Sequence, residues 1–71
     1  MDVVSGAYYT IDNSSLYVKV DVKYRGSEYL KGKVTLYYRY GTSKGIPLET
    51  KNYKLYYENI SHWQRYYPSE D

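Results

Sequence analysis

The residues to consider first for chemistry are His62 and Glu58, because His62 is the only histidine and Glu58 precedes it by four positions. On a helix, this spacing would bring a general acid and a general base together. Catalysis also requires a nucleophile or an oriented third group, yet the chain has no cysteine, no Gly-Xaa-Ser-Xaa-Gly motif and no phosphate-binding glycine loop. We therefore interpret His62 as a surface residue near a turn and predict that the protein is not an enzyme.

Metal and cofactor sites are not expected either. A structural zinc site needs four ligands, mostly His and Cys, and this chain supplies one histidine and no cysteine. The acidic residues are scattered singly, so the sequence indicates no carboxylate pair.

Tyrosine dominates the composition, with thirteen tyrosines, one tryptophan and no phenylalanine. A tyrosine ring suits positions where one end is apolar and the other is wet. We assign about half of these rings to a small core and the rest to the surface. Tyrosines and cations also alternate on one side of two expected strands, which is typical of surfaces that stack bases or anchor protein partners. The candidate binding residues are Tyr17, Lys19, Lys23, Arg25, Tyr37, Arg39, Tyr56 and Trp63.

The element that must position most of these residues is a β-hairpin over residues 16–40. Residues 16–25 and 33–40 alternate between apolar and polar, which predicts two strands with one buried face, joined by a loop over residues 26–32. If Tyr29 is the centre of that loop, the register is fixed by apolar pairing. The expected pairs are Val18 with Tyr40, Val20 with Tyr38, Val22 with Leu36 and Tyr24 with Val34, and Asp21 lies opposite Tyr37 and near Arg39.

Three further strands are expected outside this hairpin. Residues 3–11 form the first strand, residues 48–57 form the fourth with a bulge near residues 50–52, and residues 62–67 form a last strand in preference to a helical turn. Turns are expected at residues 12–15, 41–47 and 58–61, and residues 68–71 form a frayed tail.

These elements predict a single all-β domain over residues 1–71. The expected architecture is a small antiparallel five-stranded barrel or a compact sandwich, connected as a meander. The alternative is an open sheet that dimerises through an edge strand, because so small a core gains from association.

The charge and the termini limit the choice of partner and compartment. The net charge is only +2, whereas a dedicated duplex binder is usually more basic. The sequence shows neither a secretory signal nor a run of about 20 apolar residues, so we expect a cytoplasmic protein without a membrane partner.

The sequence thus favours a small binding module that acts through protein–protein interaction, as an inhibitor, an adaptor or a self-associating protein. It would use the tyrosine-rich face or an edge strand. The alternative is a nucleic-acid-binding barrel that uses the same face of tyrosine, lysine and arginine. A carbohydrate partner is not expected, although the aromatic residues around Trp63 could form a shelf for a sugar ring, because such modules are commonly secreted.

Overall fold

The structure is a computed structural model, and it describes residues 2–12, 15–39 and 45–68. Within these residues the strands are β1 (Ala7–Thr10), β2 (Leu16–Arg25), β3 (Tyr29–Tyr38), β4 (Ile46–Tyr56) and β5 (Gln64–Tyr66), and a short helix, α1 (Tyr57–Ile60), joins β4 to β5. The prediction of an all-β chain with five strands is confirmed. No helix in these ranges is long and apolar enough to cross a membrane.

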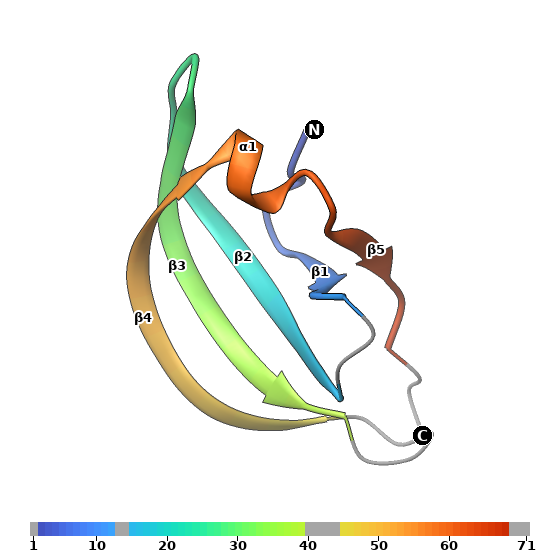
Figure 1. Cartoon of the computed structure of the whole chain (residues 1–71). Coiled ribbons are helices and arrows are strands. Elements are labelled where there is room, and N and C mark those ends of the chain that lie inside the picture. Colours follow the sequence, from blue (N-terminus) through green and yellow to red (C-terminus); the bar gives the residue numbers. More distant parts are fainter. Residues whose placement is uncertain (1, 13–14, 40–44, 69–71) are drawn as a thin grey trace.

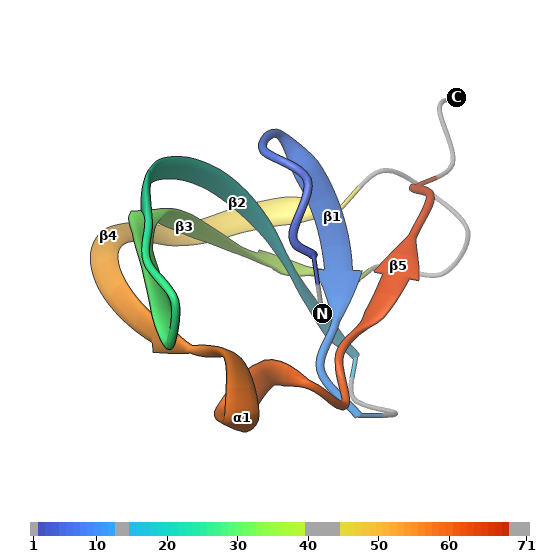
Figure 2. The same cartoon turned by 90° about the horizontal axis from the view of Figure 1, so that it is seen from above.

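The strands form one antiparallel sheet in the order β4-β3-β2-β1-β5. The first four strands follow one another as the predicted meander, whereas β5 returns to pair with β1 at the far side. The sheet is strongly bent, and α1 spans the space between its two sides (Figure 1 and Figure 2). The sheet is not closed, because β4 and β5 remain at its edges, so a barrel is not confirmed.

The core lies on the inner, concave face of the bent sheet. In β2 and β3 every second residue is apolar and points to this face over most of each strand, as the sequence predicted. The N-terminal segment and α1 cover part of the face and complete the core. The buried residues of this core are Val3, Ala7, Tyr9, Val18, Val20, Leu30, Val34 and Ile60.

The β2–β3 register differs from the predicted one. Val20 lies opposite Val34, not Tyr38, and Asp21 lies opposite Lys33, not Tyr37. The loop is shorter than expected, because β3 begins at Tyr29 and the Gly26 N–H donates to the Tyr29 carbonyl across a tight turn at 2.8 Å. Every predicted pair from Val18 to Val22 is therefore displaced by four positions, and since four is an even number, the apolar face of each strand is preserved over this length.

A β-bulge between Val22 and Tyr24 changes the end of β2. After this bulge Tyr24 lies opposite Lys31 and Arg25 lies opposite Leu30, a core residue. Residues in a cross-strand pair share a face. The bulge thus places Tyr24 on the outer face and Arg25 on the inner side, which is the reverse of the prediction.

The remaining elements agree with the sequence in type but not always in extent. β1 is shorter than residues 3–11, because Gly6 adopts a positive φ of 83° and donates its N–H to the Val20 carbonyl at 2.7 Å. The bulge in β4 lies between Glu49 and Pro47, not at residues 50–52. The last strand is confirmed as β5, and α1 occupies the turn predicted at residues 58–61. The loop predicted at residues 41–47 is too long, because β4 already begins at Ile46. The predicted pairing of Tyr40, residues 41–44 of that loop and residues 69–71 of the predicted tail lie outside the described residues.

Candidate functional site

Four rings from four strands, Tyr8, Tyr17, Tyr37 and Tyr66, form a tyrosine cluster on the outer face of the sheet. Tyr17 and Tyr37 are stacked, with ring centroids 5.0 Å apart and planes 5° apart. Tyr8 meets both rings edge-on at 5.7 and 5.8 Å, and Tyr66 lies 4.6 Å from Tyr17. Tyr17 is only 1% exposed as a result. The prediction that Tyr17 faces solvent is wrong, because β5 brings Tyr66 over it.

The hydroxyl of Tyr17 also has an internal partner. It accepts a hydrogen bond from the Gly45 N–H at 3.0 Å. A side chain at Gly45 would collide with the Tyr17 ring and hydroxyl, so this approach requires glycine. Burial raises the pKa of Tyr17 and of Tyr37 above the ordinary tyrosine value, because a phenolate in this cluster would lose hydration. Tyr17 is therefore part of the packing, whereas Tyr8, Tyr37 and Tyr66 are partly exposed.

The predicted cations do not form one face with these rings. Lys19 is half-buried beside the cluster, and Lys23 is exposed at the bulge of β2. Arg25 is exposed on the opposite side of the sheet, and the Arg39 guanidinium lies 5.5 Å from the Tyr66 ring. The structure thus divides the predicted binding residues between the tyrosine cluster and the end of the β2–β3 hairpin. Tyr56 and Trp63 belong to two further sites, described next.

A second group of rings and cations, which we call the lysine–tyrosine patch, lies on the outer face near the β2–β3 turn. The Lys54 ammonium is 4.3 Å from the Tyr29 ring centroid and 5.3 Å from that of Tyr56. Lys31 lies 5.9 Å from Tyr24 and 6.0 Å from Tyr29. A hydrogen bond to Tyr56 raises the pKa of Lys54. This patch combines charge with accessible rings, because Tyr24 and Tyr56 are exposed.

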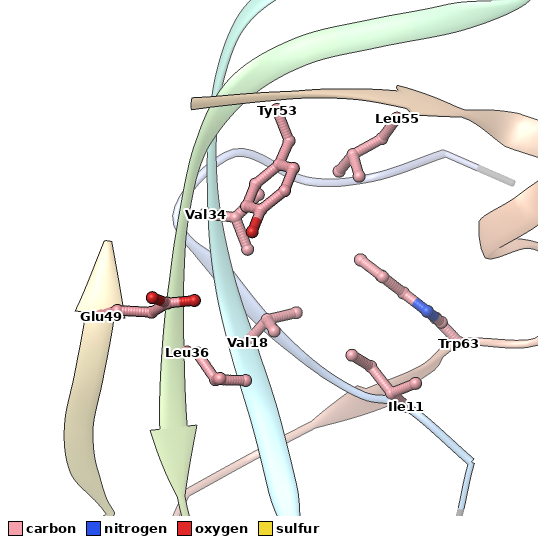
Figure 3. A pocket seen from close by; sticks show the side chains of 8 residues that line it. All are labelled: Ile11, Val18, Val34, Leu36, Glu49, Tyr53, Leu55 and Trp63. Carbon is pink, nitrogen blue, oxygen red and sulfur yellow. The ribbon is translucent and has the colours of Figure 1, made fainter. Parts of the chain in front are cut away.

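An apolar hollow opens on the inner face between β4 and Trp63. Its volume is about 210 Å³, and its walls are almost entirely hydrocarbon. Figure 3 shows Trp63 and Ile11 facing Val18 and Leu36 across the space, with the Glu49 carboxylate at one side. Together with Val34, Tyr53 and Leu55, these residues line the whole hollow. Trp63 thus lies in a surface recess, which the described residues leave uncovered.

The neighbouring strand β4 is an edge of the sheet and is exposed along almost its whole length. It has eleven residues and pairs only with β3, so the backbone groups on its other side have no strand partner among the described residues. Ile46 is 54% exposed, Leu48 55% and Tyr53 44%. A long edge strand with apolar side chains is a template for pairing with another chain. We call β4 and the apolar hollow together the edge site.

Two charged side chains lie at the middle of β4. The Lys51 ammonium is 3.7 Å from the Glu49 carboxylate, and both side chains are largely exposed. Glu49 lies opposite Leu36 and Lys51 opposite Val34, so both belong to the inner face. Such an exposed pair contributes little to stability, about 0.2 to 1 kcal/mol, and remains available to charges on a partner.

His62 is not part of the edge site. Its Nε2 atom is 3.4 Å from the Asp12 carboxylate, and both side chains are exposed. Within residues 2–12, 15–39 and 45–68, no three or more His, Cys, Asp or Glu side chains are grouped so that they could hold a metal ion.

Of the predicted binding residues, Trp63 lines the hollow and Tyr56 belongs to β4 but faces the lysine–tyrosine patch, so sequence reasoning missed most of the edge site. A signal was present in the sequence, because residues 49–52 read Glu-Thr-Lys-Asn and would place no apolar side chain on either face of a strand. A strand that is polar on both faces is typical of a sheet edge. The residues missed in the hollow are Ile11, Val18, Val34, Leu36, Glu49, Tyr53 and Leu55.

Comparison with known proteins assigns no family to this fold or to the edge site. No protein-family model matches the sequence, and neither a curated protein nor a solved structure matches the chain.

Proposed function

We propose that this chain is a non-enzymatic protein-binding module that takes an extended segment of its partner along β4 and over the apolar hollow. The observation that supports this function is the edge position of β4, an exposed strand of eleven residues beside an uncovered apolar recess. Addition of a strand to such an edge gives affinity through main-chain hydrogen bonds, and a pocket for alternate side chains gives specificity.

The chemistry of the hollow indicates what the partner would present. Hydrocarbon walls from Leu36, Leu55 and Trp63 favour an apolar side chain in the recess. The Glu49 carboxylate at its side favours a neighbouring Lys or Arg in the partner. We therefore expect partner segments in which an apolar residue and a cationic residue project from the same face of a strand.

A selection from a random peptide library tests this function. The immobilised domain should retain extended peptides with this pattern, and titration of a selected peptide should shift the backbone amide signals of β4 and the indole signal of Trp63 in two-dimensional NMR spectra.

Tyr53→Lys should weaken binding about tenfold or more, because it places a cation at the hollow. The control is Tyr67→Lys, since Tyr67 is highly exposed and follows β5 at the opposite edge. Peptides whose signals cluster elsewhere would contradict the proposal.

The lysine–tyrosine patch supports a second function, the binding of single-stranded nucleic acid. Rings that stack on bases and cations that contact phosphates act together in such sites, and Lys54 lies 4.3 Å from the Tyr29 ring with Tyr56 alongside. If this function holds, the affinity for an oligothymidylate should fall steeply with salt concentration. Lys31→Gln with Lys54→Gln should reduce the salt slope by about two, whereas Lys19→Gln should leave it unchanged. A salt-independent affinity would reject this function.

A further inference from the structure

We propose that the edge site takes a second copy of this chain, which pairs antiparallel along β4 with Thr50 at the two-fold axis. This inference rests on the proposed function, because it requires β4 to be a docking edge. The other edge of the sheet, β5, has only three residues and offers little to a partner strand. Natural edge strands are commonly protected by a charge or a proline. β4 carries both, a proline at Pro47 and charges at Glu49 and Lys51. A strand that pairs with β4 must therefore present charges that compensate these two.

The charges on β4 are complementary to themselves in one register. Glu49 and Lys51 flank Thr50 symmetrically on the same face. With Thr50 on the axis, Glu49 lies opposite Lys51 of the partner subunit, and the symmetry forms this pair twice. An axis at Glu49 or at Lys51 would instead place two like charges directly opposite each other, which is destabilising in a sheet. Charge therefore selects one register for the dimer.

The same register brings the two hollows together. A two-fold axis perpendicular to the sheet keeps the concave faces of both copies on one side. Tyr53, which is 44% exposed, lines the hollow and lies three positions from the axis, so the hollows of the two copies lie on the same face, on either side of the paired segment. Pro47 has no N–H, so we expect the hydrogen-bonded ladder to run over residues 48–52 only. A ladder this short predicts a reversible dimer.

Charge exchange tests the register directly. Sedimentation velocity over a range of about 10 μM to 1 mM should show a monomer–dimer equilibrium for the natural sequence. Glu49→Lys alone and Lys51→Glu alone should each weaken dimerisation about tenfold or more, because both symmetric pairs become repulsive. The double variant should regain the natural affinity, and a mixture of the two single variants should form a heterodimer. Glu58→Lys and Lys23→Glu, which change the same charges outside β4, are the matched controls.

Cross-linking provides a second measurement, and the chain suits it because it has no cysteine of its own. Thr50→Cys should form a disulfide-linked dimer on mild oxidation, since residues directly opposite each other have Cα atoms about 4.5 to 5.5 Å apart, within the range of a disulfide. Asn52→Cys lies two positions from the axis, so the two copies of this residue would be about 13 Å apart along the strands and should not cross-link.

The outcomes separate this inference from the function on which it rests. A natural chain that stays monomeric throughout this concentration range overturns the dimer, as does a dimer that responds equally to the control substitutions. A monomer that still binds selected peptides at β4 rejects only the second copy as the partner. A chain that neither dimerises nor binds peptides at β4 rejects the edge site itself.

Discussion

Tyr17 links the tyrosine cluster to the segment before β4, because its hydroxyl accepts the Gly45 N–H while its ring is enclosed by Tyr8, Tyr37 and Tyr66. Its sequence position on the polar face of β2 indicated exposure, and nothing local to β2 could indicate otherwise. The covering ring comes from β5, nearly fifty positions later in the chain. The burial of Tyr17 depends on a contact with a distant strand, and the alternation of apolar and polar residues within β2 carries no information about that contact.

The hydrogen bond of Tyr17 should be measurable through Tyr17→Phe. The substitution keeps the ring packing and removes the acceptor for the Gly45 N–H, so we expect a loss of about 1 kcal/mol in the free energy of unfolding. Urea denaturation followed by circular dichroism would measure it. Tyr67→Phe changes an exposed ring and is the control. Equal stability of the two variants would show that the Tyr17 hydroxyl has no structural role.

The same rings predict how stability depends on pH. Burial raises the pKa of Tyr17 and Tyr37 in the folded chain above the unfolded value of about 10. The folded state therefore holds these protons more tightly, so their contribution is fully present below pH 10 and is lost as the pH rises through the folded pKa values. Urea denaturation at pH 8 to 11 should show this fall, and it should be shallower in a variant with Tyr17→Phe and Tyr37→Phe. An unchanged slope in that variant would contradict the assignment.

At the scale of the element, β2 shows what the sequence could and could not supply. The period of two predicted the strand, its buried face and its limits at Leu16 and Arg25. The register depended on where the turn lies, and a seven-residue segment with a glycine at each end, residues 26–32, allowed several positions for it. The bulge after Val22 was also hidden, because the alternation of β2 continues through it. The Ser5 hydroxyl, which accepts the Val22 N–H at 2.9 Å, is seventeen positions away in the chain.

Gly32 allows β3 to approach β2 at this bulge. A Cβ atom at Gly32 would meet the backbone carbonyl group of Asp21 and lie 3.1 Å from the Val22 Cα atom. The backbone has little room to move, so Gly32→Ala should destabilise the fold by about 1 to 3 kcal/mol. Chemical denaturation gives the value, with Lys33→Ala as the exposed neighbouring control. A loss of less than about 0.5 kcal/mol, as for an ordinary surface substitution, would show that the strands separate easily here.

At the scale of the whole molecule, the fold depends on the return of the chain from β4 through α1 to β5. α1 is fixed at its start, where the Tyr57 N–H donates to the Glu28 carbonyl at 3.0 Å and the Tyr57 hydroxyl donates to the Gly26 carbonyl at 2.9 Å. It buries Ile60 in the core, and Trp63 then lies 6.4 Å from the Tyr9 ring. The sequence predicted a strand here but not that it would pair with β1, because a short aromatic segment carries no information about its partner.

Removal of this return segment should abolish the fold. A chain that ends at Ser61 lacks Trp63 and Tyr66 and would expose Tyr9 and Tyr17, and a domain of this size has only a few kcal/mol to lose. Its proton NMR spectrum should lack the dispersed amide signals of a folded sheet. A chain that ends at Pro68 retains β5 and is the control. Dispersed signals from the shorter chain would show that the first four strands and α1 suffice.

The pairing of β5 with β1 also has a consequence for the order in which the sheet forms and opens. The first four strands join neighbours along the chain, whereas the Thr10 hydroxyl and the Gln64 carbonyl, 3.4 Å apart, are separated by 54 positions. Closing such a long loop carries the largest entropic cost in the sheet, so β5 should dock last during folding. Since β5 has only three residues, it should also detach first under native conditions, and its amides should exchange with deuterium before those of β2 and β3. The tyrosine cluster would then open transiently from the β5 side while Trp63 stays against Tyr9, unlike in the chain that ends at Ser61, so Tyr17 would reach solvent without global unfolding.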